Sequence, residues 1–138
     1  MTSLELSVAL TIVGTVAGAI GRIATGEADR SRVVAAQGAV LDAYRLGHSL
    51  ASALGRPAEV LVTADSILVR SIGAVDTIVA RRAAGPAAGG VDISPRVHST
   101  RFSPTGLAVG AANVTHLFTR GGVTRQVIVS RLGRIRTA

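Results

Sequence analysis

The chain has 138 residues, a formal net charge of +7 and no cysteine. This length is enough for one modest folded domain, and the lack of cysteine excludes disulfide bonds and thiolate metal sites. The basic residues are fifteen arginines with no lysine, and a basic surface can attract nucleic acid or anionic lipid. Aromatic residues are limited to Tyr44, Phe102 and Phe118, so we expect a shallow, aliphatic core.

An apolar run occupies residues 1–21 and is broken by a single charged side chain, Glu5. At ~1.5 Å per residue this segment reaches about 30 Å as a helix, which is roughly one hydrocarbon core. It spans that core only if Glu5 lies inside it or at its edge. A carboxylate at such a depth costs a few kcal/mol and implies a neutralising partner. The nearest positive group in the sequence is the amine of Met1.

The charges on either side of the apolar run predict on which side of a membrane the rest of the chain would lie. Arg22, Arg30 and Arg32 follow the run, and by the positive-inside rule they would place the rest of the chain in the cytoplasm. Removal of a basic leader would balance or reverse that bias. A secretory signal peptide would need a basic region ahead of the run, and the residues before Glu5 have none.

Glycines recur within the run at Gly14, Gly18 and Gly21. The Gly14-x-x-x-Gly18 spacing permits close contact between helices in a membrane. Each glycine also lowers helix stability by roughly 1 kcal/mol relative to alanine, so the helix could melt locally here. We favour packing over melting.

The helical period continues beyond Arg22, with an apolar stripe formed by Val33, Val40, Tyr44, Ala51 and Leu54. Gly55 and Pro57 then form a stop signal, because glycine takes the left-handed cap and proline cannot continue a helix. We therefore predict one helix from about residue 2 to residue 54, whose second half packs on a sheet. Gly47 should allow that sheet to approach closely.

The remaining chain reads as β-strands separated by turn signals. We expect strands at residues 59–63, 67–72, 76–82, 100–103, 107–110, 114–120, 123–130 and 134–137, and a surface loop at 83–95. Gly121-Gly122 is a two-residue hairpin signal that requires positive φ.

Two segments resemble a known superfamily. The N-terminal Met1-Thr-Ser-Leu-Glu5-Leu with its apolar continuation is similar to the mature N-terminus of type IV pilins and type II secretion pseudopilins. The segment Phe102-Ser-Pro-Thr-Gly106, followed by residues 125–136, resembles the C-terminal half of the GspH/FimT class of minor pilins. The chain departs from the usual pattern by having Met1 in place of phenylalanine and Arg22 in place of proline.

The resemblance implies an α+β, pilin-like fold, with a long N-terminal helix on antiparallel β-sheet. It divides the chain into a transmembrane or filament-core arm at residues 1–25 and a globular pilin domain at 26–138. It also implies removal of a basic leader, a methylated residue one, and pairing of Glu5 with the residue-one amine, here that of Met1, in a neighbouring subunit. Gly14, Gly18 and Gly21 would pack between arms.

The expected function is that of a structural subunit of a type IV pilus-like filament, held in the bacterial inner membrane by a single pass before assembly. The partners are then copies of the chain and other pilins or pseudopilins, in a periplasmic or extracellular filament. Two alternatives stay open: a minor pseudopilin at the tip of a type II secretion system, or a FimT-like minor pilin that binds DNA for uptake.

The DNA alternative depends on Gly133-Arg134-Ile135-Arg136. On a strand, Arg134 and Arg136 point to one face about 7 Å apart, which matches the spacing of successive phosphates. Arg131, Arg125 and Arg120 would support them. The FimT side of the resemblance uses a Gly-Arg-x-Arg tail to bind DNA. The competing interpretation is that these arginines solvate an edge strand or bridge to acids of the next subunit.

No pattern indicates an enzyme, a cofactor or a metal. His48, His98 and His116 lack metal-ligand spacing and are expected at the surface or half-buried. Asp65, Asp76 and Asp92 lie in or beside predicted turns, where aspartate caps backbone amides. Ser103 and Ser130 have no nucleophile-elbow context, and the Gly89-Gly90 and Gly121-Gly122 pairs lack the lysine of a phosphate loop.

Overall fold

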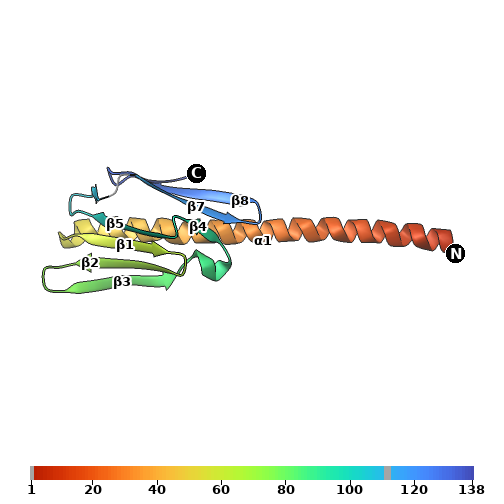
Figure 1. Ribbon diagram of the computed structural model, residues 1–138, viewed down its shortest axis with the longest axis horizontal. Coiled ribbons are helices and arrows are strands. Elements are labelled where there is room, and N and C mark those ends of the chain that lie inside the picture. Colours follow the sequence, from red (N-terminus) through yellow and green to blue (C-terminus); the bar gives the residue numbers. More distant parts are fainter. Residues whose placement is uncertain (1, 111–112) are drawn as a thin grey trace.

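The computed structural model describes residues 2–110 and 113–138. One helix precedes a series of strands along the chain (Figure 1). The elements are α1 (Ser3–Leu54), β1 (Ala58–Thr63), β2 (Ser66–Ile72), β3 (Thr77–Ala84), the 3₁₀-helix η1 (Pro86–Gly89), β4 (Asp92–Ser94), β5 (Val97–Phe102), β6 (Ala108–Val109), β7 (Val114–Arg120), β8 (Val123–Val129) and β9 (Ile135–Thr137).

Helix α1 has 52 residues, which corresponds to about 78 Å of length. Its first half projects from the domain, and its second half packs against the strands (Figure 1). The helix ends where the sequence predicts, because Gly55 adopts the left-handed conformation at φ 62°. The predicted bounds and the predicted packing are both confirmed.

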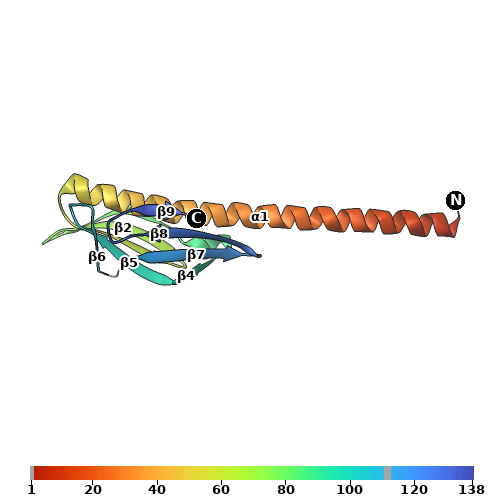
Figure 2. The same ribbon diagram turned by 90° about the horizontal axis from the view of Figure 1, so that it is seen from above.

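The strands form two antiparallel sheets. The first has the order β3-β2-β1-β5-β6 and the second has the order β4-β7-β8-β9. Both sheets contact α1 and lie on one side of it (Figure 2). The sequence-based expectation of helix on antiparallel sheet is therefore confirmed, and the division of the strands into two sheets is a finding of the structure.

The core lies where α1 meets the two sheets. The helix contributes four of the five residues of the predicted stripe, and each strand near it contributes alternate side chains. Leu54 is the exception, because at the end of α1 it is 47% exposed. The largest buried side chains are Tyr44, Phe102, Phe118, Ile67 and His116, and valines fill the space between them.

Gly47 lies at the closest approach of α1 to the first sheet. A Cβ atom at this position would come much closer to Cγ2 of Val60 than the 3.0 Å that Cβ atoms keep from other heavy atoms. Phe102 would be 3.6 Å away. The absence of a side chain at Gly47 therefore sets the spacing between helix and sheet, as predicted.

Three local predictions need correction. Residues 83–95 do not form a simple loop, because they contain η1 and the edge strand β4, which pairs with β7. Strand β5 begins at Val97, three residues before the predicted start, because its whole length pairs with β1. The last strand begins at Ile135, and Arg134 belongs to the preceding turn.

The predicted hairpin at Gly121-Gly122 is confirmed. These glycines have φ values of 53° and 82°, and they join β7 to β8 in continuous register.

Candidate functional site

The N-terminus of α1 is closed by a capping box between Thr2 and Glu5. The Thr2 backbone N–H donates to Glu5 Oε2 at 2.8 Å, and the Glu5 backbone N–H donates to Thr2 Oγ1 at 3.4 Å. The carboxylate is thus held at the tip of the arm, next to the start of the chain. Met1 lies outside the described residues, so the predicted roles of Met1 and Glu5 stay predictions.

The arm is apolar around its whole circumference. Every residue from 2 to 28 is exposed, and an 18-residue window of α1 has a mean hydropathy of 1.8 with none of it buried. By length and composition, this helix can cross a membrane once. The exposed large side chains are Leu4, Leu6, Val8, Leu10, Ile12, Val13, Val16, Ile20 and Ile23.

The polar side chains of the arm are satisfied within the helix. The hydroxyl groups of Ser7, Thr11 and Thr15 each donate to the carbonyl four residues earlier, at 2.8 to 3.1 Å. Such bonds remove the need for water around these groups. The arm is therefore suited to an apolar environment despite its hydroxyls, which sequence reasoning did not consider.

The helix runs without interruption through Gly14, Gly18 and Gly21. A Cβ atom at any of these positions would meet no described atom within 4 Å. No contact among the described residues therefore requires glycine at these positions, and their role in packing between arms stays a prediction.

Packing of α1 on the domain begins at Asp29, the first residue that is not fully exposed. Its carboxylate accepts from Arg120 Nε at 2.7 Å, and Nη1 of Arg120 donates to the carbonyls of Gly89 and Gly90 at 2.8 and 3.0 Å. Arg120 therefore joins the helix, the end of β7 and the segment after η1. Its guanidinium group is engaged in these contacts and not grouped with Arg134 and Arg136.

The boundary between arm and domain at residue 25 stays a prediction.

The tail arginines are held by two turns that pack against each other. Gly133, at φ 75°, lies so close to the carbonyl oxygen of Gly106 that a Cβ atom would clash with it. His48 of α1 borders both glycines and contacts Phe102 edge-on, with ring centroids 5.6 Å apart. Residues 102–106 and 133–136, which both belong to the C-terminal part of the resemblance, are therefore neighbours in space.

The five predicted arginines do not form one cluster. Arg136 pairs in register with Ile128, on the outer face of the second sheet, and Arg134 is also exposed. Arg125 pairs with Phe118, which is fully buried. Because register partners share a face, Arg125 lies on the side toward α1. Arg131 lies in the exposed turn before β9.

A buried polar network lies between the two sheets. The hydroxyl of Tyr44 is 2.7 Å from Nε2 of His116 and 3.4 Å from Oγ1 of Thr100, and the ring of His98 lies 5.7 Å from that of His116. Burial lowers the pKa of His116 to about 4 and raises the pKa of Tyr44 to about 12. His116 was expected at the surface or half-buried. It is instead fully buried, because its position in β7 faces the core.

Glu59 is a buried acid that the sequence analysis missed. Its carboxylate pairs with Arg70 and accepts from Ser99 Oγ at 2.6 Å. Burial opposes the charge, but these hydrogen bonds and the nearby Arg101 outweigh it, so the pKa of Glu59 lies below its usual value. The sequence signal was an acid inside a β-branched run.

The predicted turn aspartates have different positions. Asp76 pairs with Arg56 at 3.1 Å, Asp65 lies in the turn after β1, and Asp92 begins β4. Among the described residues, no group of three histidine, cysteine, aspartate or glutamate side chains could hold a metal ion.

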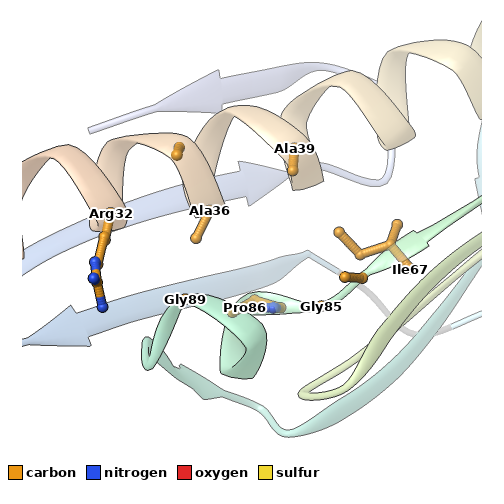
Figure 3. Close-up of a pocket in the computed structure, with 9 residues that line it drawn as sticks. Arg32, Ala36, Ala39, Ile67, Gly85, Pro86 and Gly89 are labelled. Carbon is orange, nitrogen blue, oxygen red and sulfur yellow. The ribbon is translucent and has the colours of Figure 1, made fainter.

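A small groove of about 210 Å³ opens beside α1 at the end of the domain nearest the arm. Figure 3 shows Ala36 and Ala39 of α1 facing Gly85 and Pro86, with Arg32 at one side. The walls are mostly apolar, and Arg32 is exposed. The groove can therefore take a small apolar group, and it presents a positive charge at its edge.

Comparison with known proteins supports the fold. No protein-family model matches the sequence, and no curated protein matches it significantly. Two crystal structures of the type IV minor pilin FimU from Pseudomonas aeruginosa resemble the chain, each at 16% sequence identity. The first has a TM-score of 0.66, and the match covers 79% of this chain and 90% of the FimU chain. The second has a TM-score of 0.59, and the match covers 75% of this chain and 90% of the FimU chain. The chain thus has a type IV pilin-like fold.

Proposed function

We propose that the chain is a structural subunit of a type IV pilus-like filament, held in the inner membrane by its arm before assembly and by arm-to-arm packing afterwards. The observation that carries this proposal is the arm itself, which is exposed along residues 2–28. Burying a large apolar side chain is worth about 1.5–3 kcal/mol, so the nine such side chains of the arm favour burial by about 14–27 kcal/mol. Lipid and neighbouring arms both provide that burial.

Glu5 is the register residue in this proposal. A carboxylate in an apolar filament core needs a positive partner, and the residue-one amine of a neighbouring subunit supplies one. The capping box keeps the carboxylate at the arm tip, where the hydrogen bonds to Thr2 satisfy it until that amine arrives. Gly14, Gly18 and Gly21 then allow adjacent arms to approach closely.

The test is replacement of Glu5 by alanine or glutamine in the producing cell. Both variants should stop filament assembly and leave the folded domain intact, as judged by circular dichroism of the detergent-extracted protein. Glu27→Gln is the matched control, because Glu27 is an exposed acid of the same helix beyond the apolar run, and it should assemble normally. Normal filaments from Glu5→Ala would refute the pairing role.

Copy number separates a repeating subunit from a minor one. The sequence predicts a structural subunit that packs with copies of itself, whereas the two similar structures are described as minor pilins. The ratio of this chain to total pilin in purified filaments decides between these alternatives. A type II secretion pseudopilin would be distinguished by loss of protein secretion when the chain is deleted.

DNA binding is the second candidate function, and one observation favours it. Arg134 and Arg136 are exposed, and neither pairs with a carboxylate among the residues that the structure describes. We expect duplex DNA to bind weakly and without sequence preference. An Arg134→Ala/Arg136→Ala double variant should reduce the salt dependence of binding by about one unit of slope per lost phosphate contact. If wild type and the double variant bind duplex DNA with equal affinity at both of two salt concentrations, DNA binding through these arginines is excluded.

A further inference from the structure

Three exposed arginines of α1 lie where the apolar arm joins the domain, and we call them the arm-side arginines. They are Arg22, Arg30 and Arg32. None of them pairs with a carboxylate among the residues that the structure describes. A helix turns by about 100° per residue, so Arg30 and Arg32 lie about 80° to either side of Arg22. The three side chains therefore leave the helix over one half of its circumference.

The acids near the arm-side arginines do not neutralise them. Asp29 is engaged by Arg120, and Glu27 lies about 140° away from Arg22 around the helix. The strands and turns at this end of the domain carry two arginines and two acids without ion pairs, namely Arg96, Arg125, Asp65 and Asp92. These four charges balance, so the three arm-side arginines less Glu27 leave a net charge of +2.

The membrane stage of the function proposed above, on which this step rests, determines where these arginines lie. A hydrocarbon core of about 30 Å takes about 20 helical residues, so a core that begins at Glu5 ends near residue 25. Arg22 then lies about one turn inside that edge, and Arg30 and Arg32 begin about 8 and 10 Å outside it. The headgroup layer is about 5–8 Å thick on each side, so it lies between Arg22 and the other two.

The geometry of a helix lets all three side chains reach the headgroup layer. Helical side chains lean toward the N-terminus of their helix, which directs Arg30 and Arg32 back toward the bilayer. Arg22 extends outward, as long basic side chains do at the edge of a membrane. Guanidinium groups on both sides of the layer can therefore bind the same phosphate.

A shallow groove of about 300 Å³ continues from Arg22 along the arm, lined by Thr15, Gly18 and Ala19. These residues lie on the same side of the helix as Arg22. The Thr15 hydroxyl is directed to helix carbonyls, at 2.9 and 3.1 Å, so the surface of the groove is effectively apolar. The groove suits an acyl chain whose headgroup is at the arginines.

We propose that the arm-side arginines bind the headgroup of an anionic phospholipid, with one acyl chain of that lipid in the groove beside Arg22. The positive charge matches an anionic headgroup, and the groove is continuous with the segment that crosses the membrane, where lipid is the solvent. The lipid holds the subunit in the bilayer before assembly. In the filament a neighbouring arm replaces the acyl chain, because the groove includes Gly18, at which arms are proposed to pack.

The test is native mass spectrometry of the full chain in a non-ionic detergent, titrated with phosphatidylglycerol or with phosphatidylcholine of the same acyl chains. This measurement resolves each bound lipid and gives a Kd for it. Wild type should bind phosphatidylglycerol more tightly than phosphatidylcholine. Arg30→Gln/Arg32→Gln should weaken phosphatidylglycerol binding about 5- to 25-fold, at about fivefold for each arginine near the headgroup.

Matched controls separate the site from total charge and from the helix itself. Arg45→Gln/Arg82→Gln removes the same charge from two exposed arginines away from the arm, and its Kd should equal that of wild type. Gly18→Leu fills the groove and should weaken both lipids alike. Ala17→Leu adds the same bulk about 140° away from Arg22 around the helix and should leave both Kd values unchanged.

Equal Kd values for the two lipids in wild type would overturn the headgroup site, as would equal losses in the two arginine double variants. Undiminished binding by Gly18→Leu would overturn the position of the acyl chain. Release of phosphatidylglycerol by excess soluble glycerol phosphate would show that phosphate alone is bound and would overturn the assignment to lipid.

Insertion of the arm is measured separately, by flotation of the full chain with phosphatidylcholine vesicles in high salt. A chain that floats but shows no preference for phosphatidylglycerol would overturn the lipid site and leave the proposed function standing. A chain that does not float would overturn the membrane stage of that function.

Discussion

Replacing Gly47 by alanine should destabilise the domain, although the same change elsewhere in a helix is stabilising. The added Cβ would collide with Cγ2 of Val60, a fully buried side chain directly attached to a central strand. Overpacking of this kind costs about 1–3 kcal/mol. The higher helix propensity of alanine offsets about 1 kcal/mol of this cost, so the net loss of stability should be as much as about 2 kcal/mol.

Gly38→Ala is the matched control. Gly38 lies in the same helix, and a Cβ there would meet no described atom within 4 Å, so this variant should gain about 0.5–1 kcal/mol. Thermal unfolding of the detergent-solubilised chain, followed by circular dichroism, should place the Tm of Gly47→Ala as much as about 8 °C below wild type. The Tm of Gly38→Ala should lie about 2–4 °C above wild type. A Gly47→Ala protein as stable as Gly38→Ala would refute the close-packing argument.

The other predictions concern the core network, the helix anchor and the tail turn. Because burial lowers the pKa of His116 from 6.5 to about 4, the unfolded chain binds a proton first as pH falls. The free energy of unfolding should therefore drop by about 3 kcal/mol between pH 6.5 and pH 4. Denaturant titrations over this range should show a smaller drop for His116→Gln than for wild type, and an equal drop would contradict the role of His116. Arg120→Ala should lower the free energy of unfolding by about 1–3 kcal/mol and leave the salt dependence of DNA binding unchanged. A changed salt dependence would indicate that Arg120 contacts DNA. Gly133→Ala should lower Tm because both its positive φ and its neighbours exclude a side chain, and an unchanged Tm would contradict the packed-turn geometry.

The features predicted correctly from sequence are those set by local chemistry. The apolar stripe on α1 and the stop at Gly55 depend on residues close together in the chain, as does the Gly121-Gly122 turn. Gly47 is a related case, because a glycine on the buried stripe of a helix indicates close approach of another element.

The features missed depend on pairing between distant segments. Arg120 was grouped with the tail arginines, but its partner Asp29 lies 91 residues earlier in the chain. Arg125 and Arg136 were grouped by proximity in sequence, but strand alternation places them on opposite faces of one sheet. His116 was expected at the surface or half-buried, but it is buried against Tyr44, which lies 72 residues earlier in the chain. Composition alone does not indicate these contacts.

The central claim is that the arm becomes the core of a filament with Glu5 as its register residue. The most direct measurement is an electron cryomicroscopy map, at helical resolution, of filaments containing this chain. It should show residues 2–28 buried among neighbouring arms, with the Glu5 carboxylate within hydrogen-bonding distance of the residue-one amine of an adjacent subunit. An arm that lies outside the filament core, or a Glu5 that faces solvent, would contradict the claim.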